Sequence, residues 1–203
     1  MKKLYFQLIQ IFILTIPSIF YYQLVQYIKN DYLKISQKRD LSAEYHVPSP
    51  DYLWIDNNKE CYECFYNDIF NNEYFLIHVG TDIVARTCDS SNVLPGKAQC
   101  DGGNGHIWVG INNGEVRKDK FQMLLMNKNT NYYWVSASNG HIPSNALKGG
   151  KKNSETLYIG RTYYDNYLVP GRIVPSEGKI FITMGGQEIS FHIYEILVYD
   201  KNN

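Results

Sequence analysis

Beyond residue 50, apolar and polar residues alternate in short runs along the chain. Ile189, Phe191 and Ile193, for example, are separated by Ser190 and His192, and this period of two is typical of a strand with one buried face. Turn-forming residues rich in glycine and asparagine separate the runs, at 102–104, 112–114, 176–178 and 185–186. No stretch after residue 50 has the apolar spacing of a helix, so the pattern predicts an all-β domain.

The first 28 residues follow a different pattern. Two lysines precede nineteen mostly apolar residues from Leu4 to Tyr22, which predicts an N-terminal hydrophobic helix acting as a signal anchor or a signal peptide. The residues before Ser18 and Ala43 make poor cleavage sites, so an uncleaved anchor is favoured; an amphipathic surface helix is an alternative. Residues 29–51 follow as a linker or stalk. We therefore expect a single-pass membrane-anchored or secreted protein, and lysines on both sides of the segment leave its orientation open.

Two segments of the remaining chain repeat each other. Arg-Thr at 86–87 and Pro-Gly-Lys at 95–97 recur 75 residues later as Arg-Thr and Pro-Gly-Arg, and the stretches 105–109 and 121–125 recur 73 residues later. A near-constant offset in the same order indicates a tandem repeat, with repeat 1 at 52–127 and repeat 2 at 132–200. Because neither copy alone would bury much core, we expect one pseudo-symmetric, antiparallel, β-sandwich-like domain.

Composition and charge exclude several functional classes. The chain has 203 residues, of which 44% are hydrophobic, a share too high for a disordered chain. Its 20 basic and 20 acidic residues give a formal net charge of zero, which argues against a general nucleic-acid binder. Its five histidines are scattered, with no nucleophile motif, phosphate-binding loop or zinc-protease motif around them. We therefore expect no enzymatic activity and no cofactor.

All four cysteines of the chain lie in repeat 1: Cys61, Cys64, Cys88 and Cys100. Four thiols confined to one copy predict a local staple of two disulfides if the domain is lumenal or extracellular. Cys61 and Cys64 also have the spacing of zinc ligands, but the second pair lacks the short spacing of a common second half-site. Disulfides are therefore favoured over a metal site, with free or partly paired thiols as a further alternative.

Repeat 2 contains a distinctive set of motifs. In chain order they are Trp134, Asn-Gly-x-x-Pro at 139–143, Tyr-x-Gly-Arg at 158–161, Pro-Gly-Arg at 170–172 and Tyr-Glu-x-Leu at 194–197. This combination resembles the DM9 repeat. Repeat 1 looks like a degenerate copy, because it keeps Arg86, Pro-Gly-Lys and Glu115 but lacks the Asn-Gly-x-x-Pro segment. The resemblance implies a β-rich, pseudo-symmetric protein, since members of this family usually carry the repeat in tandem.

Some DM9 proteins are mannose-binding lectins that take part in recognition of microbial surfaces, so the resemblance implies a non-enzymatic, carbohydrate-binding protein. In those members the sugar is held chiefly by the Lys of Pro-Gly-Lys and by an Asp upstream of the Arg of the repeat. The Lys is matched by Lys97 and, conservatively, by Arg172, both expected on turns where side chains can reach a cleft. The Asp has no match, so Glu155 or Glu73 would have to supply the acceptor.

A site with cations alone would bind a neutral sugar weakly and would prefer anions. The expected partners are therefore mannose-type glycans or anionic surface ligands, with a membrane contact through the N-terminal segment and a possible homodimer. The alternative is a structural or protein-interaction module that has lost sugar binding. The recurring charges of the two copies are expected to have a structural role, with Arg86 and Arg161 pairing with Glu115 and Glu188.

Overall fold

The computed structural model describes residues 50–57, 73–101 and 104–200. The hydrophobic segment predicted at 1–28 and nearly all of the predicted linker lie outside the described residues. In the described part of the chain, no helix is long and apolar enough to cross a membrane. The described residues are all-β apart from one short 3₁₀-helix, Pro175–Glu177, which confirms the all-β part of the fold prediction.

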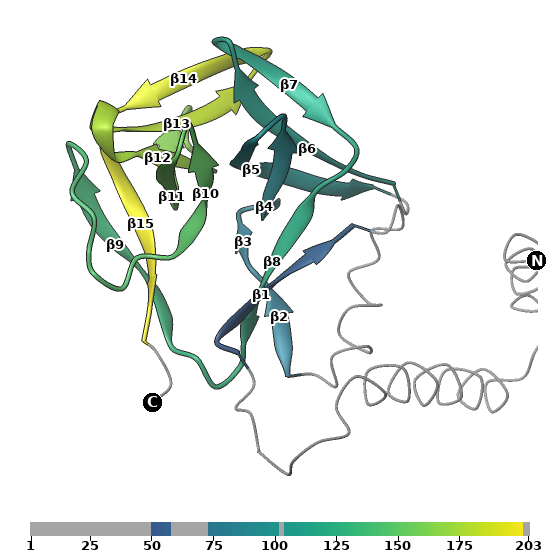
Figure 1. The fold of residues 1–203 in the computed structure, drawn as a ribbon, viewed down its shortest axis with the longest axis vertical. Coiled ribbons are helices and arrows are strands. Elements are labelled where there is room, and N and C mark those ends of the chain that lie inside the picture. Colours follow the sequence, from purple (N-terminus) through teal and green to yellow (C-terminus); the bar gives the residue numbers. More distant parts are fainter. Residues whose placement is uncertain (1–49, 58–72, 102–103, 201–203) are drawn as a thin grey trace, which may run out of the picture. The chain divides into compact units, whose positions relative to one another are not determined.

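The described residues form fifteen strands, whose arrangement is drawn in Figure 1. In chain order they are β1 (Tyr52–Asp56), β2 (Tyr74–Leu76), β3 (His78–Val79), β4 (Asp82–Asp89), β5 (Asn92–Asp101), β6 (Asn104–Ile111), β7 (Gly114–Lys118), β8 (Gln122–Asn127), β9 (Tyr132–Ser138), β10 (Lys148–Lys152), β11 (Glu155–Tyr164), β12 (Tyr167–Val174), β13 (Lys179–Met184), β14 (Gln187–Phe191) and β15 (Ile193–Tyr199). The alternation seen in the sequence corresponds to burial: Ile180 and Ile182 are buried, whereas Lys179 and Phe181 are half-buried.

The strand order across the sheet is symmetric, because the second repeat follows the order of the first in reverse. It reads β1-β8-β4-β5-β6-β7 through the first repeat and continues as β14-β13-β12-β11-β15-β9 through the second. The two halves meet where β7 pairs with β14, through Gly114 and Gln187. Each strand of the first half therefore has a counterpart in the second half, at the same distance from this junction. Trp54 on β1 and Trp134 on β9 are such counterparts.

A second junction closes the sheet on itself. β10 pairs with β11 along residues 148–152 and also with β5, through Lys151 and Val93. A ring of eight strands results, β5-β6-β7-β14-β13-β12-β11-β10, in place of the two facing sheets of the expected sandwich-like arrangement. Alternation shows which face of a strand is buried, but it does not show whether the last strand meets the first. Closure leaves fewer strand edges unpaired.

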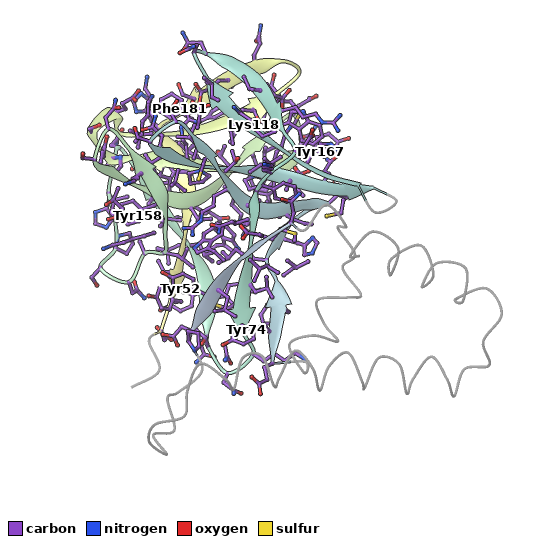
Figure 2. The ribbon with its side chains drawn as sticks, turned by 45° about the vertical axis from the view of Figure 1, so that its right-hand side comes forward. Tyr52, Tyr74, Lys118, Tyr158, Tyr167 and Phe181 are labelled. Atoms are coloured by element: carbon purple, nitrogen blue, oxygen red, sulfur yellow. The ribbon has the colours of Figure 1, made fainter. Side chains whose placement is uncertain are left out.

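The apolar core has three clusters, and one of them belongs to both repeats. This shared cluster joins Val84 and Leu124 of repeat 1 to Leu147, Ile159 and Leu197 of repeat 2. The other two clusters are built mainly from one repeat each. Contacts between the repeats reach the ends of the sheet, where the rings of Tyr52 (labelled in Figure 2) and Tyr199 lie 5.3 Å apart. The repeats therefore share one core, as expected for copies too small to bury one alone.

The Pro-Gly-Lys and Pro-Gly-Arg triplets lie inside strands, not on turns as expected. Residues 95–97 are in the middle of β5 and residues 170–172 are in β12, each with a strand paired on both sides. The glycine is needed because the neighbouring strand approaches closely. A Cβ atom at Gly96 would overlap the carbonyl oxygen of Trp108 on β6, and the counterpart glycine of β12 is crowded in the same way. The motif therefore fixes the spacing of strands as well as the position of the cation that follows it.

Candidate functional site

Each repeat carries an arginine packed against a tryptophan. In repeat 1, the guanidinium carbon of Arg86 lies 4.1 Å from the ring centre of Trp54. The Arg86 Nε donates a hydrogen bond of 2.8 Å to Oε1 of Gln122, which stands opposite it on β8. Burial lowers the pKa of the Arg86 guanidinium. The arginine thus ties β4 to β1 and β8 through a cation–π contact and a hydrogen bond.

The counterpart arginine of repeat 2 makes the same arrangement with a carboxylate. Arg161 lies 4.5 Å from the ring centre of Trp134, and its Nε donates a hydrogen bond of 2.6 Å to Oε2 of Glu195. Recurrence of the cluster on the outer strands of both halves indicates a structural role for these arginines.

The expected pairing of Arg86 with Glu115 and of Arg161 with Glu188 is wrong. Arg86 is on β4 and Glu115 on β7, with β5 and β6 between them, a separation of roughly 14 Å across the sheet. The same distance separates β11 from β14. The two glutamates pair instead with the cations of the Pro-Gly motifs.

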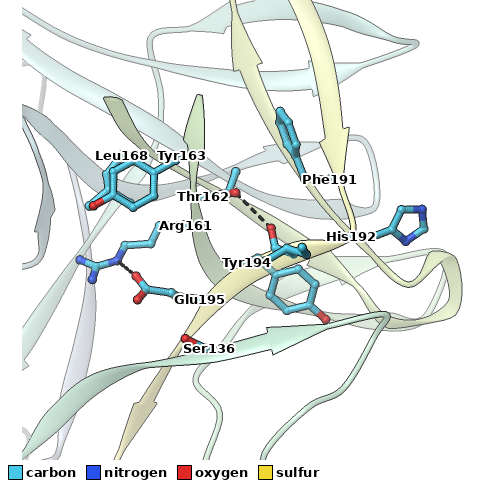
Figure 3. A pocket seen from close by; sticks show the side chains of 10 residues that line it. Ser136, Arg161, Thr162, Tyr163, Leu168, Phe191, His192, Tyr194 and Glu195 are labelled. Carbon is cyan, nitrogen blue, oxygen red and sulfur yellow. Dashed lines mark hydrogen bonds and ion pairs between the residues drawn. The ribbon is translucent and has the colours of Figure 1, made fainter. Parts of the chain in front are cut away.

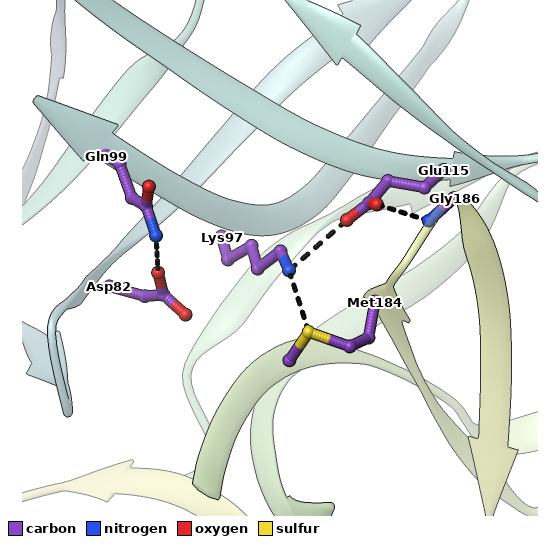
Figure 4. Close-up of polar contacts among 6 residues, drawn as sticks. All are labelled: Asp82, Lys97, Gln99, Glu115, Met184 and Gly186. Carbon is purple, nitrogen blue, oxygen red and sulfur yellow. Dashed lines mark hydrogen bonds and ion pairs between the residues drawn. The ribbon is translucent and has the colours of Figure 1, made fainter.

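Lys97 lies in a buried cluster that joins the two repeats. Its Nζ is 3.2 Å from Oε1 of Glu115, 3.8 Å from the sulfur of Met184 and 5.6 Å from the ring centre of Trp108. Glu115 Oε2 accepts a hydrogen bond of 2.8 Å from the N–H of Gly186 (Figure 4). The Lys97 and Glu115 side chains are only 9% and 11% exposed. Because Met184 and Gly186 belong to repeat 2, the lysine of one repeat is held partly by the other.

Arg172 and Glu188 form the counterpart pair in repeat 2. Their ion pair is more deeply buried, with side chains 4% and 7% exposed, and the guanidinium lies 5.4 Å from the ring centre of Phe181. Gly110 leaves room for it, because a Cβ atom there would overlap the Glu188 carboxylate. Burial lowers the pKa of Arg172 and raises the pKa of Glu188, with Arg172 opposing the second shift. Each partner is therefore costly to bury without the other.

A pocket of about 660 Å³ lies beside Lys97 and is built from both repeats. Repeat 1 supplies Asp82, Lys97 and Gln99, whereas repeat 2 supplies Met184 and the hairpin residues 163–169. Gln99 Nε2 donates a hydrogen bond of 2.7 Å to Oδ1 of Asp82 (Figure 4). The pocket therefore brings an ammonium, a carboxylate and an amide together, which provides hydrogen-bond donors and acceptors in one place.

Asp82 is a carboxylate of this pocket that the motif comparison did not identify. It is the first residue of β4 and is only 8% exposed. The sequence does contain a signal for it. The hairpin pairs Asp89 with Asn92, so counting back along both strands places residue 82 opposite residue 99, two positions beyond Lys97. Register, not distance along the chain from the arginine, brings the carboxylate to the lysine.

Arg172 lies beside a smaller pocket, of about 360 Å³. Asp89 and Asn92, at the β4–β5 turn of repeat 1, line it together with Lys152 of repeat 2. The Lys97 pocket is lined in the same way by the β11–β12 turn of repeat 2. Each cation therefore faces the hairpin turn of the other repeat, and the two pockets are counterparts with different linings.

Glu155, a predicted sugar ligand, contacts a different part of the fold. Its Oε1 accepts a hydrogen bond of 2.8 Å from the N–H of Ser176, and its Oε2 accepts one of 2.7 Å from the Ser176 hydroxyl. It therefore holds the start of the 3₁₀-helix and is not among the residues that line the Arg172 pocket. Glu73, the other predicted acceptor, is not among those that line the Lys97 pocket.

The Asn-Gly-x-x-Pro segment forms a tight turn after β9. Asn139 and Gly140 have φ values of 50° and 82°, in the region that glycine and asparagine tolerate best. The Gly140 N–H donates a hydrogen bond of 3.0 Å to the hydroxyl of Tyr194. Burial raises the pKa of Tyr194, and this hydrogen bond opposes the shift. The Asn-Gly-x-x-Pro and Tyr-Glu-x-Leu motifs are therefore in contact, and this contact stabilises the turn.

The expected pair of disulfides is not formed, because Cys88 is an exposed free thiol. Cys88 stands opposite Val93, and Cys100 is seven residues further along β5, roughly 23 Å away, too far for a disulfide. Cys100 is disulfide-bonded, whereas Cys61 and Cys64 lie outside the described residues. No cluster of three or more potential metal ligands occurs among the residues that the structure describes.

A third pocket, of about 560 Å³, lies beside the Arg161–Glu195 pair (Figure 3). Its apolar lining includes Tyr163, Leu168 and Ile193. Its charged residues, Arg161 and Glu195, are paired with each other.

Comparisons with known proteins identify a matching family and a solved structure of similar fold. The DM9 repeat matches residues 80–191 and, in an overlapping second match, residues 151–203. Among solved structures, the chain is similar to the nematode sperm cell motility protein MFP2B, with a TM-score of 0.57 at 13% identity. The likeness covers 81% of this chain and 50% of that one, so the chain spans about half the length of MFP2B. At this identity the likeness concerns the fold alone. A search of curated proteins found no match.

Proposed function

This chain belongs to the DM9 repeat family, and we propose that it is a non-enzymatic carbohydrate-binding protein that holds a neutral, mannose-type sugar in the Lys97 pocket. One observation carries the proposal: Asp82 and Gln99 lie in the same pocket as Lys97. The hydroxyl groups of a pyranose both donate and accept hydrogen bonds, so a site for neighbouring hydroxyls needs groups of both kinds.

The polar groups of the pocket have capacity left for a ligand. An ammonium has three N–H donors, and Lys97 directs its Nζ toward two partners, Glu115 and Met184. Asp82 accepts a hydrogen bond from Gln99 at Oδ1, and the described residues provide no partner for its other oxygen. A sugar hydroxyl that donates to Asp82 while its neighbour accepts from Lys97 would use both.

The charge around the pocket favours a neutral ligand over an anionic one. Asp82 and Asp165 line the pocket, and Glu115 already neutralises Lys97. A carboxylate or sulfate group would therefore meet two uncompensated negative charges. An anionic ligand was expected because the sequence suggested a site with cations alone. Asp82 adds a carboxylate to the pocket, so that reason no longer applies.

The Arg172 pocket has no carboxylate at the position that corresponds to Asp82. The counterpart of Asp82, at the offset of 75 that relates Arg86 to Arg161, is Leu157, which is fully buried in the core. The Arg172 side chain, 4% exposed in its pair with Glu188, is also more deeply buried than the Lys97 side chain, 9% exposed. We therefore propose one neutral-sugar site per chain. The competing proposal is a protein-interaction module without sugar binding, in a membrane-anchored or secreted protein in either case.

The test uses a substitution that repeat 2 already contains. Lys97→Arg preserves the charge and the pairing with a glutamate, as in Arg172–Glu188, but replaces the compact ammonium with a larger, planar group. We expect the melting temperature to be kept and the affinity for methyl mannoside, measured by calorimetry, to fall by roughly tenfold or more, the equivalent of one lost hydrogen bond to a charged group. Asp82→Asn should weaken binding similarly.

Asp119→Asn, at an exposed carboxylate paired with Arg117, is the matched control and should bind like the wild type. A folded wild-type protein that binds no sugar on a glycan array would remove the lectin proposal and leave the interaction module. Binding that survives both pocket substitutions would place the site elsewhere.

A further inference from the structure

The β11–β12 hairpin exposes aromatic side chains to solvent. Among the described residues, the large hydrophobic side chains that are exposed are Tyr133, Tyr163, Tyr167 and Ile193, all in repeat 2. Tyr163 and Tyr167, at either side of the hairpin turn, are each 68% exposed. Exposed tyrosines gathered at one loop tip are characteristic of binding surfaces, because the ring offers a large, rigid contact area at a low entropic cost.

The counterpart hairpin of repeat 1 has no aromatic residue at these places. At the offset of 75, Tyr164 corresponds to Asp89 and Tyr167 to Asn92. Because each hairpin faces the cation of the other repeat, the aromatic hairpin lies beside Lys97 and the polar one beside Arg172. The aromatic surface therefore accompanies the pocket that has Asp82, and only that one of the two.

The turn holds Tyr164 and Tyr167 in a fixed arrangement. Asp165 and Asn166 have φ values of 48° and 65°, as in the tight two-residue turn of a hairpin. Tyr164 and Tyr167 stand directly opposite each other in the register, so their side chains leave the same face of the hairpin. The ring of Tyr164 is supported by Phe191, 6.1 Å away. Tyr167 is thus an exposed ring at the rim of the Lys97 pocket, beside a partly buried one.

We infer that the Tyr164–Tyr167 rim is a second sugar subsite, so that the ligand is a neutral oligosaccharide of at least two residues. The inference rests on the proposed function of the Lys97 pocket. One residue binds Asp82 and Lys97 through its hydroxyls, and the next lays the apolar C–H face of its ring on Tyr167. Tyrosine suits this ligand, since its ring contacts C–H groups while its hydroxyl and those of the sugar stay in water.

Features of the rim favour a sugar over a protein segment. The rim is continuous with the pocket, since Tyr164, Asp165, Asn166 and Tyr167 all line it. Its remaining groups are a carboxylate and an amide, which are hydrogen-bond partners for hydroxyls. A volume of about 660 Å³ is also in the range of sites for ligands larger than one hexose.

The experiment compares methyl mannoside with a panel of mannobioses and a mannotriose, by calorimetry on the full chain. For the wild type we expect at least one oligosaccharide to bind roughly tenfold more tightly than the monosaccharide, the gain of one stacked ring. Tyr167→Ala should abolish this gain, so that the oligosaccharide binds no more tightly than the monosaccharide. Tyr167→Phe, which keeps the ring, should retain it. Tyr133→Ala, at an exposed tyrosine of β9, is the control and should behave as the wild type.

Failure of this inference is distinguishable from failure of the proposed function. Monosaccharide binding with no gain from any longer sugar overturns the subsite and leaves the Lys97 site standing. No binding of any sugar by the folded protein overturns both. A gain that survives Tyr167→Ala, or a change in sedimentation of that variant without a change in sugar affinity, would show that the rim serves self-association or another contact and overturn the inference.

Discussion

Removing the cation from the Arg172–Glu188 pair should destabilise the domain strongly. In Arg172→Met, the Glu188 carboxylate, 7% exposed, loses its ion-pair partner and keeps only the weaker attraction of Lys152. Breaking a buried pair in this way costs about 3–5 kcal/mol. For a domain of this size, each kcal/mol lowers the melting temperature by about 2–4 °C. The expected fall is therefore about 6–20 °C.

The cost should depend on pH. Burial already raises the pKa of Glu188 above its ordinary value of 4.5, and Arg172 opposes this shift. In the variant that opposition is gone, so the native pKa rises further. Above 4.5, the native carboxyl then keeps a proton that the unfolded chain has released, so the free energy of unfolding falls as pH rises through the window up to the native pKa. The difference between variant and wild type should therefore be smaller near about pH 5 than near about pH 7.5.

Urea unfolding at the two pH values measures the effect, and two further variants make it specific. Arg172→Met with Glu188→Leu removes both charges and should return to within about 1.5 kcal/mol of the wild type. Arg117→Met removes one partner of an exposed pair, with side chains 59% and 79% exposed, and should change stability by no more than about 0.5 kcal/mol. A single variant that loses less than about 1 kcal/mol, or a double variant as unstable as the single one, would refute the reasoning.

Further predictions follow from individual contacts. Gly96→Ala should cost about 1–3 kcal/mol in urea unfolding, because its Cβ meets backbone of β6, whereas Gly114→Ala, whose Cβ would meet only ordinary contacts, should be nearly neutral. Arg161→Ala should lower stability by about 1–2 kcal/mol in thermal unfolding, through loss of the Trp134 and Glu195 contacts. The exposed thiol of Cys88 should react rapidly with maleimide in the folded protein, and Cys88→Ser should remove that labelled site in mass spectra without lowering the melting temperature.

The strand pattern and repeat offsets predict much of this fold from the sequence. A period of two identifies strands because burial on one face selects alternate residues, and a constant offset identifies counterpart strands. The closing contact between Lys151 and Val93 is not predicted, because it joins segments that share no motif and its formation depends on how the twisted sheet curves. The placement of Pro-Gly-Lys on a turn failed for a related reason. Proline and glycine usually mark turns, and here the glycine serves a close approach between strands.

The candidate site was predicted in part. The motif comparison identified Lys97, because the cation follows the Pro-Gly pair directly. It did not identify Asp82, because a hydrogen-bonded hairpin brings the two together from positions that the motif does not specify. The sequence also did not predict the partner of each cation, because Glu115 lies two strands from Lys97 across the sheet, with β6 between them.

Each pocket is lined by the hairpin turn of the other repeat. This explains how the degenerate repeat can carry the cation and the carboxylate of the proposed sugar site. Lys97 and Asp82 belong to repeat 1, which has lost the Asn-Gly-x-x-Pro turn, whereas the turn that flanks them belongs to repeat 2. The Asn-Gly-x-x-Pro turn contacts Tyr194 within its own repeat and contributes to neither pocket, so its loss from repeat 1 leaves the polar groups of the site intact. Changes in the hairpin of one repeat act on the pocket of the other. Transplanting the β4–β5 turn sequence Asp-Ser-Ser-Asn into the β11–β12 hairpin should therefore impair the Lys97 pocket while every residue of repeat 1 stays the same, and a calorimetric measurement that shows unchanged affinity for oligosaccharides would contradict this division of roles.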